Sequence, residues 1–349
     1  MIYHSGTGTL EVSRLQIANG NYSGTAASGT FYGGCIASQG YLSLSGATVK
    51  DCHLDASGGA NAAGGGVWAA TGGSLFGGGV ITGNSVTANG KGTGIAGGIA
   101  TNGPISLDHA TVNNKMASTA FGGIVSTSTG MSYVTSSTIS GNSASYFGGA
   151  AFSGSVTIGN STISGNNSSI ERGVLAAIGP SIQIYNSTIA FNSSGGSGAE
   201  GVAAYFGRTA TAFSVTMQST IISNNTAADG PSDLYFASGG SVSGSGNLIY
   251  APYAQQGSTP PSGFGLPAGT CPLLSPLRDN GAYFHTFTHA LQSGSPALTA
   301  GNNSKNLSED ERNLPRTSTG SFGLVFTDIG AYEVQRDDIV FNAGFDGCP

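Results

Sequence analysis

The stretch STISGN occurs twice in the chain, at Ser137–Asn142 and, 24 residues later, at Ser161–Asn166. Looser copies follow as STIAFN at Ser187–Asn192 and STIISN at Ser219–Asn224. Recurrence at a nearly fixed spacing is typical of one supersecondary unit that stacks on copies of itself. The motif therefore predicts a repeat architecture.

The isoleucine of this motif marks equivalent positions along most of the chain. The markers, separated by 24 to 32 residues, are Ile17, Val49, Ile81, Val112, Ile139, Ile163, Ile189 and Ile221. Two other signals recur with the same spacing: a Gly-Gly pair before a short apolar segment, and alternating segments such as SVTIGNSTI and SIQIYNSTI. Because the markers hold one slot in consecutive units, we expect their side chains to point inward as one stacked column.

Each unit contains two or three short strands with period-two alternation, broken by Gly, Asn and Ser. Units stacked at about 4.8 Å per coil pair their backbones and share one core. The pattern predicts an all-β, right-handed parallel β-helix (solenoid) of about eight or nine coils with an irregular C-terminal cap. Three residues after the marker, an asparagine recurs in five units, and it is expected to adopt the left-handed conformation and to hydrogen-bond the Asn above and below. These asparagines are Asn84, Asn142, Asn166, Asn192 and Asn224, and the other units have Gly20, Cys52 and Lys115 there. A β-propeller or a leucine-rich repeat needs blades of about 40 residues or a leucine framework, and the chain has neither.

The sequence divides into three parts. Residues 1–250 carry the β-helix repeats, residues 251–336 form a capping region, and residues 337–349 form a tail motif. Repeat arrays need capping units to stay soluble. We therefore expect residues from about 271 to 336 to fold back over the last coil and shield its edge.

Composition excludes several classes of function. Only 8% of the 349 residues are charged and the formal net charge is −6, without a basic patch, which argues against nucleic acid as a partner. The sequence contains no run of about 18 apolar residues, so it predicts no membrane span. Motifs for a phosphate-binding loop, a nucleophile elbow or a zinc protease are missing, so we expect no cofactor.

The four cysteines lie far apart and form no CxxC motif. Metal-knuckle spacing is therefore missing, and two disulfides can form. Cys271 and Cys348 are a candidate pair because both lie in the irregular C-terminal third.

Three acidic residues interrupt the repeat where earlier units have Gly-Gly. Stacking predicts that they lie along one edge of successive coils, at a spacing that permits glycoside hydrolysis. The catalytic candidates are Glu171, Glu200 and Asp233, and the binding candidates beside them are Arg172, Tyr205, Phe206 and Arg208. The simpler interpretation is that the carboxylates are solvated or paired with the two arginines.

Other polar clusters have weaker functional interpretations. Asp51, His53 and Asp55 lie on one side of an extended segment and could bind a metal, although a solvated coil edge explains them as well. Asp108-His109 is interpreted as a surface turn. His285 and His289 are expected to pack or hydrogen-bond within the cap.

Two regions resemble known bacterial families. Phe121–Ile124 (FGGI) and Phe147–Ala150 (FGGA), with the later S-x-I-x-x-N, resemble the repeats of chlamydial polymorphic outer-membrane proteins over roughly residues 10–250. Cys271–Gly301, Glu309–Arg316 and Thr327–Glu333 are similar to the C-terminal region of choice-of-anchor Q β-helix proteins. The chain departs from that pattern at Ala282, Thr299 and Glu311.

The final residues, Asp337–Gly347, resemble a short C-terminal motif of secreted proteins from xanthomonad-like bacteria. These resemblances imply an exported or surface protein and no particular reaction. The start MIYHSG lacks the features of a signal peptide. We therefore expect a leader and one or more coils upstream of Met1, because a bare first coil leaves an open sheet edge.

These observations favour a secreted or cell-surface β-helix, extracellular or on the outer membrane of a Gram-negative bacterium. It is expected to be non-catalytic and to present a long face for adhesion or for binding polysaccharide or cell-surface glycans. The alternative is a polysaccharide lyase or glycoside hydrolase, which rests on analogy with enzymes of the same fold. Only 11 Lys and Arg residues argue against a lyase of anionic polymers.

Overall fold

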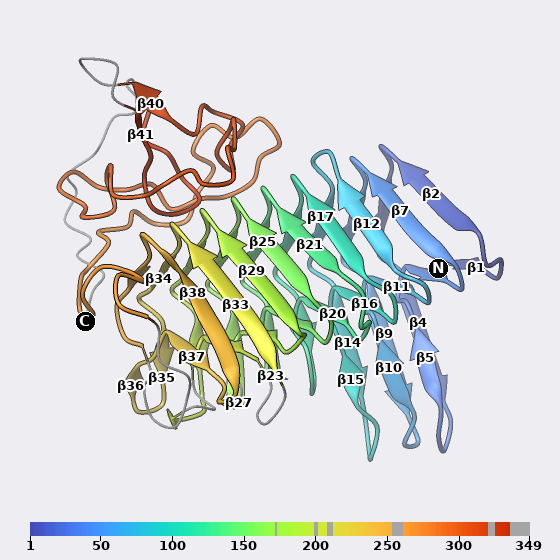
Figure 1. Ribbon diagram of the computed structural model, residues 1–349. Coiled ribbons are helices and arrows are strands. Elements are labelled where there is room, and N and C mark those ends of the chain that lie inside the picture. Colours follow the sequence, from blue (N-terminus) through green and yellow to red (C-terminus); the bar gives the residue numbers. More distant parts are fainter. Residues whose placement is uncertain (172, 199–201, 208–211, 253–260, 320–324, 336–349) are drawn as a thin grey trace.

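The computed structural model describes residues 1–171, 173–198, 202–207, 212–252, 261–319 and 325–335. Within these residues the chain forms strands and turns without a helix, wound into a parallel β-solenoid of about eight turns. Figure 1 shows the coils stacked side by side, with the C-terminal region lying across one flank of the later coils. The predicted all-β parallel β-helix is confirmed.

Three sheets form the sides of a prism around the main core. Sheet A runs β1 (Ile2–His4), β6 (Ile36–Ser38), β11 (Val67–Ala69), β16 (Ile99–Thr101), β20 (Ile124–Ser126), β24 (Ala150–Phe152), β28 (Leu175–Ala177), β32 (Ala204–Phe206) and β37 (Leu234–Phe236). Sheet B runs β2 (Thr9–Ser13), β7 (Tyr41–Ser45), β12 (Gly73–Phe76), β17 (Ile105–Asp108), β21 (Ser132–Thr135), β25 (Val156–Gly159), β29 (Ser181–Tyr185), β33 (Phe213–Gln218) and β38 (Gly240–Ser245). Sheet C runs β3 (Gln16–Ala18), β8 (Thr48–Lys50), β13 (Val80–Thr82), β18 (Thr111–Asn113), β22 (Thr138–Ser140), β26 (Thr162–Ser164), β30 (Thr188–Ala190), β34 (Ile221–Ser223) and β39 (Leu248–Ile249).

Two further sheets extend the prism on one side, where the first coils form the projecting arms seen in Figure 1. Sheet D runs β4 (Asn21–Thr25), β9 (His53–Ser57), β14 (Ser85–Ala88), β19 (Met116–Ala117), β23 (Ser143–Tyr146), β27 (Asn167–Glu171), β31 (Ser193–Ser194), β35 (Thr226–Ala227) and β36 (Gly230–Pro231), of which β36 alone is antiparallel to its neighbour. Sheet E holds β5 (Thr30–Tyr32), β10 (Asn61–Ala63) and β15 (Gly94–Ile95). A separate antiparallel pair, β40 (Ser318–Thr319) and β41 (Val325–Phe326), lies in the C-terminal region.

The marker residues stack as predicted up to the last coil. Ile139, Ile163 and Ile189 pair in register and have no exposed surface. The last marker is wrong by one residue, because Ile189 pairs with Ile222, whereas Ile221 faces outward and packs in the apolar cluster under the C-terminal region. Two adjacent isoleucines made this register ambiguous in the sequence, and a one-residue shift moves a strand residue to the opposite face.

An asparagine ladder runs along the corner between sheets C and D. The side-chain amide of Asn142 donates to Oδ1 of Asn166 at 2.8 Å, and Asn166 and Asn192 continue the series at 3.0 and 2.9 Å. The ladder goes on through Asn225, not the predicted Asn224, and Asn225 donates to Asp233 at 2.7 Å. The predicted hydrogen bonds between stacked asparagines are therefore confirmed, with the same one-residue correction in the last repeat.

At this corner, the residue directly before each ladder asparagine has the left-handed backbone conformation. Gly141 and Gly165 have φ of +62° and +63°, and Phe191 and Asn224 hold the same place at +56° and +59°. The expectation that the ladder asparagines themselves are left-handed is wrong. The glycine of STISGN makes the turn, and this frees the following asparagine to point inward and hydrogen-bond along the stack.

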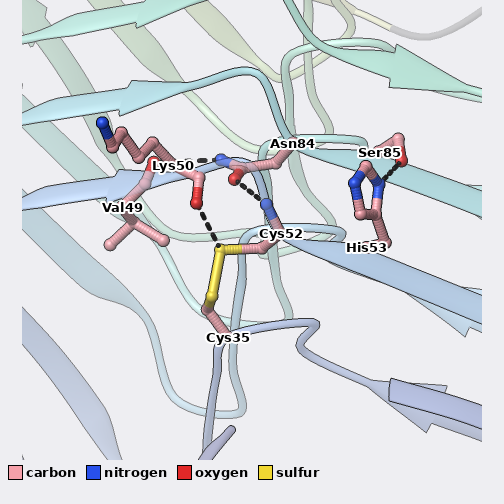
Figure 2. Close-up of a disulfide and its surroundings, with 7 residues drawn as sticks. All are labelled: Cys35, Val49, Lys50, Cys52, His53, Asn84 and Ser85. Atoms are coloured by element: carbon pink, nitrogen blue, oxygen red, sulfur yellow. Dashed lines mark hydrogen bonds between the residues drawn. A yellow bond between two sulfur atoms is a disulfide. The ribbon is translucent and has the colours of Figure 1, made fainter. Parts of the chain in front are cut away.

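A disulfide closes the second coil between Cys35 and Cys52, 17 residues apart. Figure 2 shows Cys52 in the ladder slot of its coil, where its backbone N–H donates to Oδ1 of Asn84 at 2.9 Å. The pairing expected for Cys271 and Cys348 cannot be placed, since Cys348 lies outside the described residues.

The C-terminal region lies along the side of the solenoid, on the outer face of sheet C. Glu311 accepts hydrogen bonds from the hydroxyls of Thr138 and Thr162 at 2.9 and 2.5 Å, and His289 bonds Ser164 at 2.7 Å. Burial raises the pKa of the Glu311 carboxyl well above its usual range, although both threonine donors lower it. The region therefore covers a flank of successive coils and not the final edge, which corrects the predicted position.

A short segment before this region closes the last coil instead. Pro252 forms a bridge with Leu234, and Gly265 forms one with Asn247. The ring of Phe264 packs edge-on against Phe236 with centroids 6.0 Å apart. These contacts cover the end of the apolar core.

A buried ionic network holds the C-terminal region together. Arg312 has no exposed side-chain surface, pairs with Asp310 at 2.8 Å and lies 3.7 Å from the centroid of the Tyr332 ring. Arg316 donates to the backbone carbonyls of Gly330 and Ala331. Buried arginines need such hydrogen bonds and ion pairs because an unpaired buried charge is costly.

Candidate functional site

Two of the three prism faces are covered by other parts of the chain. The outer face of sheet C lies under the C-terminal region. The outer face of sheet A carries an apolar cluster in which Tyr32 packs on Trp68 with ring centroids 4.0 Å apart and Phe121 stacks on Phe147 at 5.4 Å. Sheet B, which faces the viewer in Figure 1, is the remaining long face.

The outer face of sheet B consists of two rows of side chains in exact strand register. One row is Glu11, Ser43, Ser74, Ser106, Tyr133, Thr157, Gln183, Thr216 and Ser243. The other is Ser13, Ser45, Phe76, Asp108, Thr135, Gly159, Tyr185, Gln218 and Ser245. Parallel pairing places neighbours in a row about 4.8 Å apart. The face is thus a flat lattice of hydroxyl and amide groups with aromatic rings near its middle.

Tyr185 lies flat on this face. A Cβ built on Gly159, its neighbour in the preceding coil, would come within 2.1 Å of the Tyr185 ring, so the ring occupies the space that any other residue at 159 would need. Aromatic rings that cover glycines in this way stabilise sheets. Burial raises the pKa of the Tyr185 hydroxyl, and the nearby Tyr133 adds to the shift. Tyr133 itself is 46% exposed.

The C-terminal region forms a wall at one edge of these tyrosines. Lys305 Nζ donates to Oε1 of Gln183 at 3.3 Å and lies 5.7 Å from the centroid of the Tyr185 ring. One residue earlier, Ser304 bonds Gln218 at 2.5 Å. Two tyrosines, an amide and a cation therefore come together from three parts of the chain.

The structure describes only part of the predicted row of carboxylates, Glu171, Glu200 and Asp233. Glu200 and the side chain of Glu171 lie outside the described residues, as do Arg172 and Arg208. The backbone of Glu171 pairs with Tyr146 in sheet D. Asp233 comes directly before β37 in sheet A, whereas Glu171 ends β27 in sheet D, so these two residues do not lie along one edge as expected.

Asp233 is fully buried and ends the asparagine ladder. Its Oδ2 accepts the backbone N–H of Ala251 at 2.7 Å, while its Oδ1 accepts from Asn225. Burial raises the pKa of the carboxyl to about 7 against the opposing effect of these donors. Asp233 is therefore a buried residue that ends the stack, and the interpretation of a solvated carboxylate is wrong for it.

The aromatic platform proposed beside these carboxylates is also placed differently. Phe206 has no exposed surface and packs in the prism against Phe236, with centroids 6.1 Å apart. Tyr205 faces out of sheet A and packs on Tyr235 at 5.2 Å. Phe206 is therefore a core residue and not part of a platform.

The Asp51, His53 and Asp55 trio does not form a metal site. His53 bonds Ser85 at 2.5 Å, as Figure 2 shows, and Asp55 accepts from Thr87. Within the described ranges, no three potential ligands of the His, Cys, Asp or Glu type gather closely enough to hold a metal ion.

The other histidines serve the contact between solenoid and C-terminal region. His109 pairs with Asp108 at 3.0 Å, packs on Phe284 and bonds Asn313, so the predicted surface turn is a docking contact. His289 bonds the Ser275 carbonyl at 2.7 Å, as expected within the cap, and burial lowers its pKa to about 4. His285 pairs with Asp279 at 2.9 Å.

The tyrosine pair on sheet B was missed from the sequence. The aligned segments SVTIGNSTI and SIQIYNSTI place Gly159 and Tyr185 at the same position of neighbouring repeats. A glycine followed one coil later by an aromatic residue at the same outward position is the signal that could have identified it. Lys305 carried no such signal, because it is 120 residues further along the chain than Tyr185.

Comparison with known proteins found no matching family model, curated protein or solved structure. Over the part of the chain that the structure describes, no helix has the length and apolar character to cross a membrane. The parallel β-solenoid is thus the class of protein established for this chain.

Proposed function

We propose that this β-solenoid is a non-catalytic binding protein, secreted or displayed on the surface of a Gram-negative bacterium, that uses the outer face of sheet B to bind glycans or glycan-coated surfaces. The observation that carries the proposal is that sheet B remains open along the solenoid while sheets A and C are covered. A flat lattice of hydroxyl and amide groups with aromatic rings offers the hydrogen bonds and stacking surfaces that sugars need.

Sequence resemblances support the proposed location. The FGGI and FGGA repeats and the C-terminal blocks are similar to those of exported bacterial β-helix proteins. The low fraction of charged residues, 8%, favours recognition through hydrogen bonds and stacking over recognition through charge. A C-terminal region held by buried ion pairs and hydrogen bonds suits a protein that has to persist outside the cell.

The test is binding of the purified chain to a glycan array and to intact bacterial and animal cells, with variants that disturb one face at a time. Ser74→Glu with Thr216→Glu changes sheet B, and Asn167→Glu is the matched control on exposed sheet D. We expect the sheet B variant to bind at least about tenfold more weakly and the control to bind normally, since surface changes of this kind leave stability within about 0.5 kcal/mol.

Two results would contradict the proposal. One is equal binding by both variants, which would place the binding surface elsewhere. The other is turnover of a polysaccharide in reducing-sugar or unsaturated-product assays that Glu171→Gln or Glu200→Gln abolishes, which would establish the enzymatic alternative.

A further inference from the structure

The tyrosine pair on sheet B is organised as a subsite. Gly159 leaves the space in which the Tyr185 ring lies flat, and Tyr133, 46% exposed, stands two coils before Tyr185 in the adjacent row. Two coils correspond to roughly 10 Å. This separation suits the apolar C–H faces of two pyranose rings with one sugar between them, because such faces pack on aromatic rings.

Two glutamine side chains, Gln183 and Gln218, lie in the same two rows as the tyrosines. The side-chain oxygen of Gln183 is engaged by Lys305, while its amide nitrogen has no acceptor among the described residues. Gln218 is held from the other side by Ser304. The amide nitrogen of Gln183 can therefore donate to a ligand oxygen without breaking an existing bond.

Lys305 brings a positive charge to the same place. None of the ion pairs found among the described residues includes it. Its ammonium group lies 5.7 Å from the centroid of the Tyr185 ring, and within the described ranges its hydrogen-bond acceptor is the Gln183 oxygen. An ammonium group without a carboxylate partner in the described part of the chain is complementary to an anionic ligand group.

We propose that Tyr133, Gln183, Tyr185 and Lys305 form a subsite for a carboxylated sugar, a uronic acid residue within a glycan chain. The tyrosines stack on the sugar rings, Gln183 donates to a hydroxyl or ring oxygen, and Lys305 pairs with the carboxylate. This inference rests on the proposed glycan-binding function and specifies the class of glycan.

The experiment compares the acid and methyl-ester forms of oligogalacturonate and of oligomannuronate by isothermal titration calorimetry, because the ester keeps the ring and removes the charge. The acid form of at least one of them should bind more tightly than its ester. Lys305→Gln should weaken binding of the acid about two- to fivefold at low salt and leave the ester unchanged. Tyr133→Ala should weaken binding of both forms by up to about tenfold.

Matched controls remove the same groups elsewhere. Lys91→Gln deletes an exposed lysine on an arm, and Tyr283→Ala deletes a tyrosine that is 77% exposed in the C-terminal region. Both controls should bind as the unaltered chain does. Circular dichroism of every variant shows whether the solenoid is intact.

The outcomes separate this inference from the proposed function. Tighter binding of the esters, or of neutral cello- and xylo-oligosaccharides, would overturn the acidic subsite and leave glycan binding in place. An equal loss for acid and ester with Lys305→Gln would also overturn it. No binding of any acidic or neutral glycan, with intact fold, would remove both.

Discussion

Asn166 is the residue at which the asparagine ladder can be tested most directly. Its Oδ1 accepts both the backbone N–H and the side-chain amide of Asn142, and its own amide donates to the Ile139 carbonyl and to Asn192. The residue has no exposed surface. Asn166→Ala removes all four bonds at once in the middle of the stack.

The size of the effect follows from the groups left behind. The backbone N–H of Asn142 and the carbonyl of Ile139 lose this partner, and the Asn142 amide keeps only its bond to the carbonyl of Val112. The Asn192 oxygen keeps the backbone N–H of residue 166. A buried group left unpaired costs about 1 to 3 kcal/mol. Two groups without this partner predict a loss of about 2 to 6 kcal/mol.

The assay is equilibrium unfolding in urea, followed by circular dichroism and tryptophan fluorescence. Asn167→Ala is the control, because this neighbour is exposed and its side chain makes one bond, to Ser193 at 2.7 Å. The control should change stability by no more than about 0.5 kcal/mol. The reasoning is refuted if Asn166→Ala shifts the unfolding midpoint no further than Asn167→Ala does at an unchanged slope.

Three further predictions concern the core, the disulfide and the C-terminal region. Ile163→Ala should cost about 2 to 5 kcal/mol by leaving a cavity, whereas Ile170→Ala, at a side chain that is 51% exposed, should cost far less; similar losses in urea unfolding would argue against the stacked column. Reducing the Cys35–Cys52 bond should cost about 3 kcal/mol, since it closes a loop of 17 residues; an unchanged melting temperature in reductant would contradict this. Burial raises the folded-state pKa of Glu311 well above its unfolded value near 4.5, so the stability that the protonated carboxyl contributes is present below about pH 4.5 and is lost as pH rises through the raised pKa; Glu311→Gln should flatten this decline in stability with rising pH, and an equally steep decline in the variant would count against it.

The repeat motif specified the coil almost completely. In STISGN the first serine accepts the backbone N–H of the preceding coil, as Ser161 does from Ser137 at 3.2 Å. The isoleucine fills the core, the glycine makes the left-handed turn and the asparagine continues the ladder. The core and ladder positions could be assigned because stacking places chemically identical residues of neighbouring repeats in contact. The left-handed position was assigned one residue too late, to the asparagine instead of the glycine.

The last repeat shows where this reading failed. STIISN has the first three residues and the last residue of the motif. In the structure, however, the core and ladder positions lie one residue further along the chain, at Ile222 and Asn225. The choice was decided by Ile221, which packs under the C-terminal region. A local pattern cannot report a contact made by a distant segment.

Sequence alone therefore determined the parallel β-solenoid, its strand alternation and its corner ladders, because these depend on interactions between adjacent repeats. Tertiary structure decided which faces are covered. The path of the C-terminal region over sheet C brings Lys305 to Tyr185 and Glu311 to Thr138. Those contacts join residues more than 100 positions apart in segments without internal periodicity. No spacing in the sequence encodes them, and the candidate site became visible only when the chain was folded.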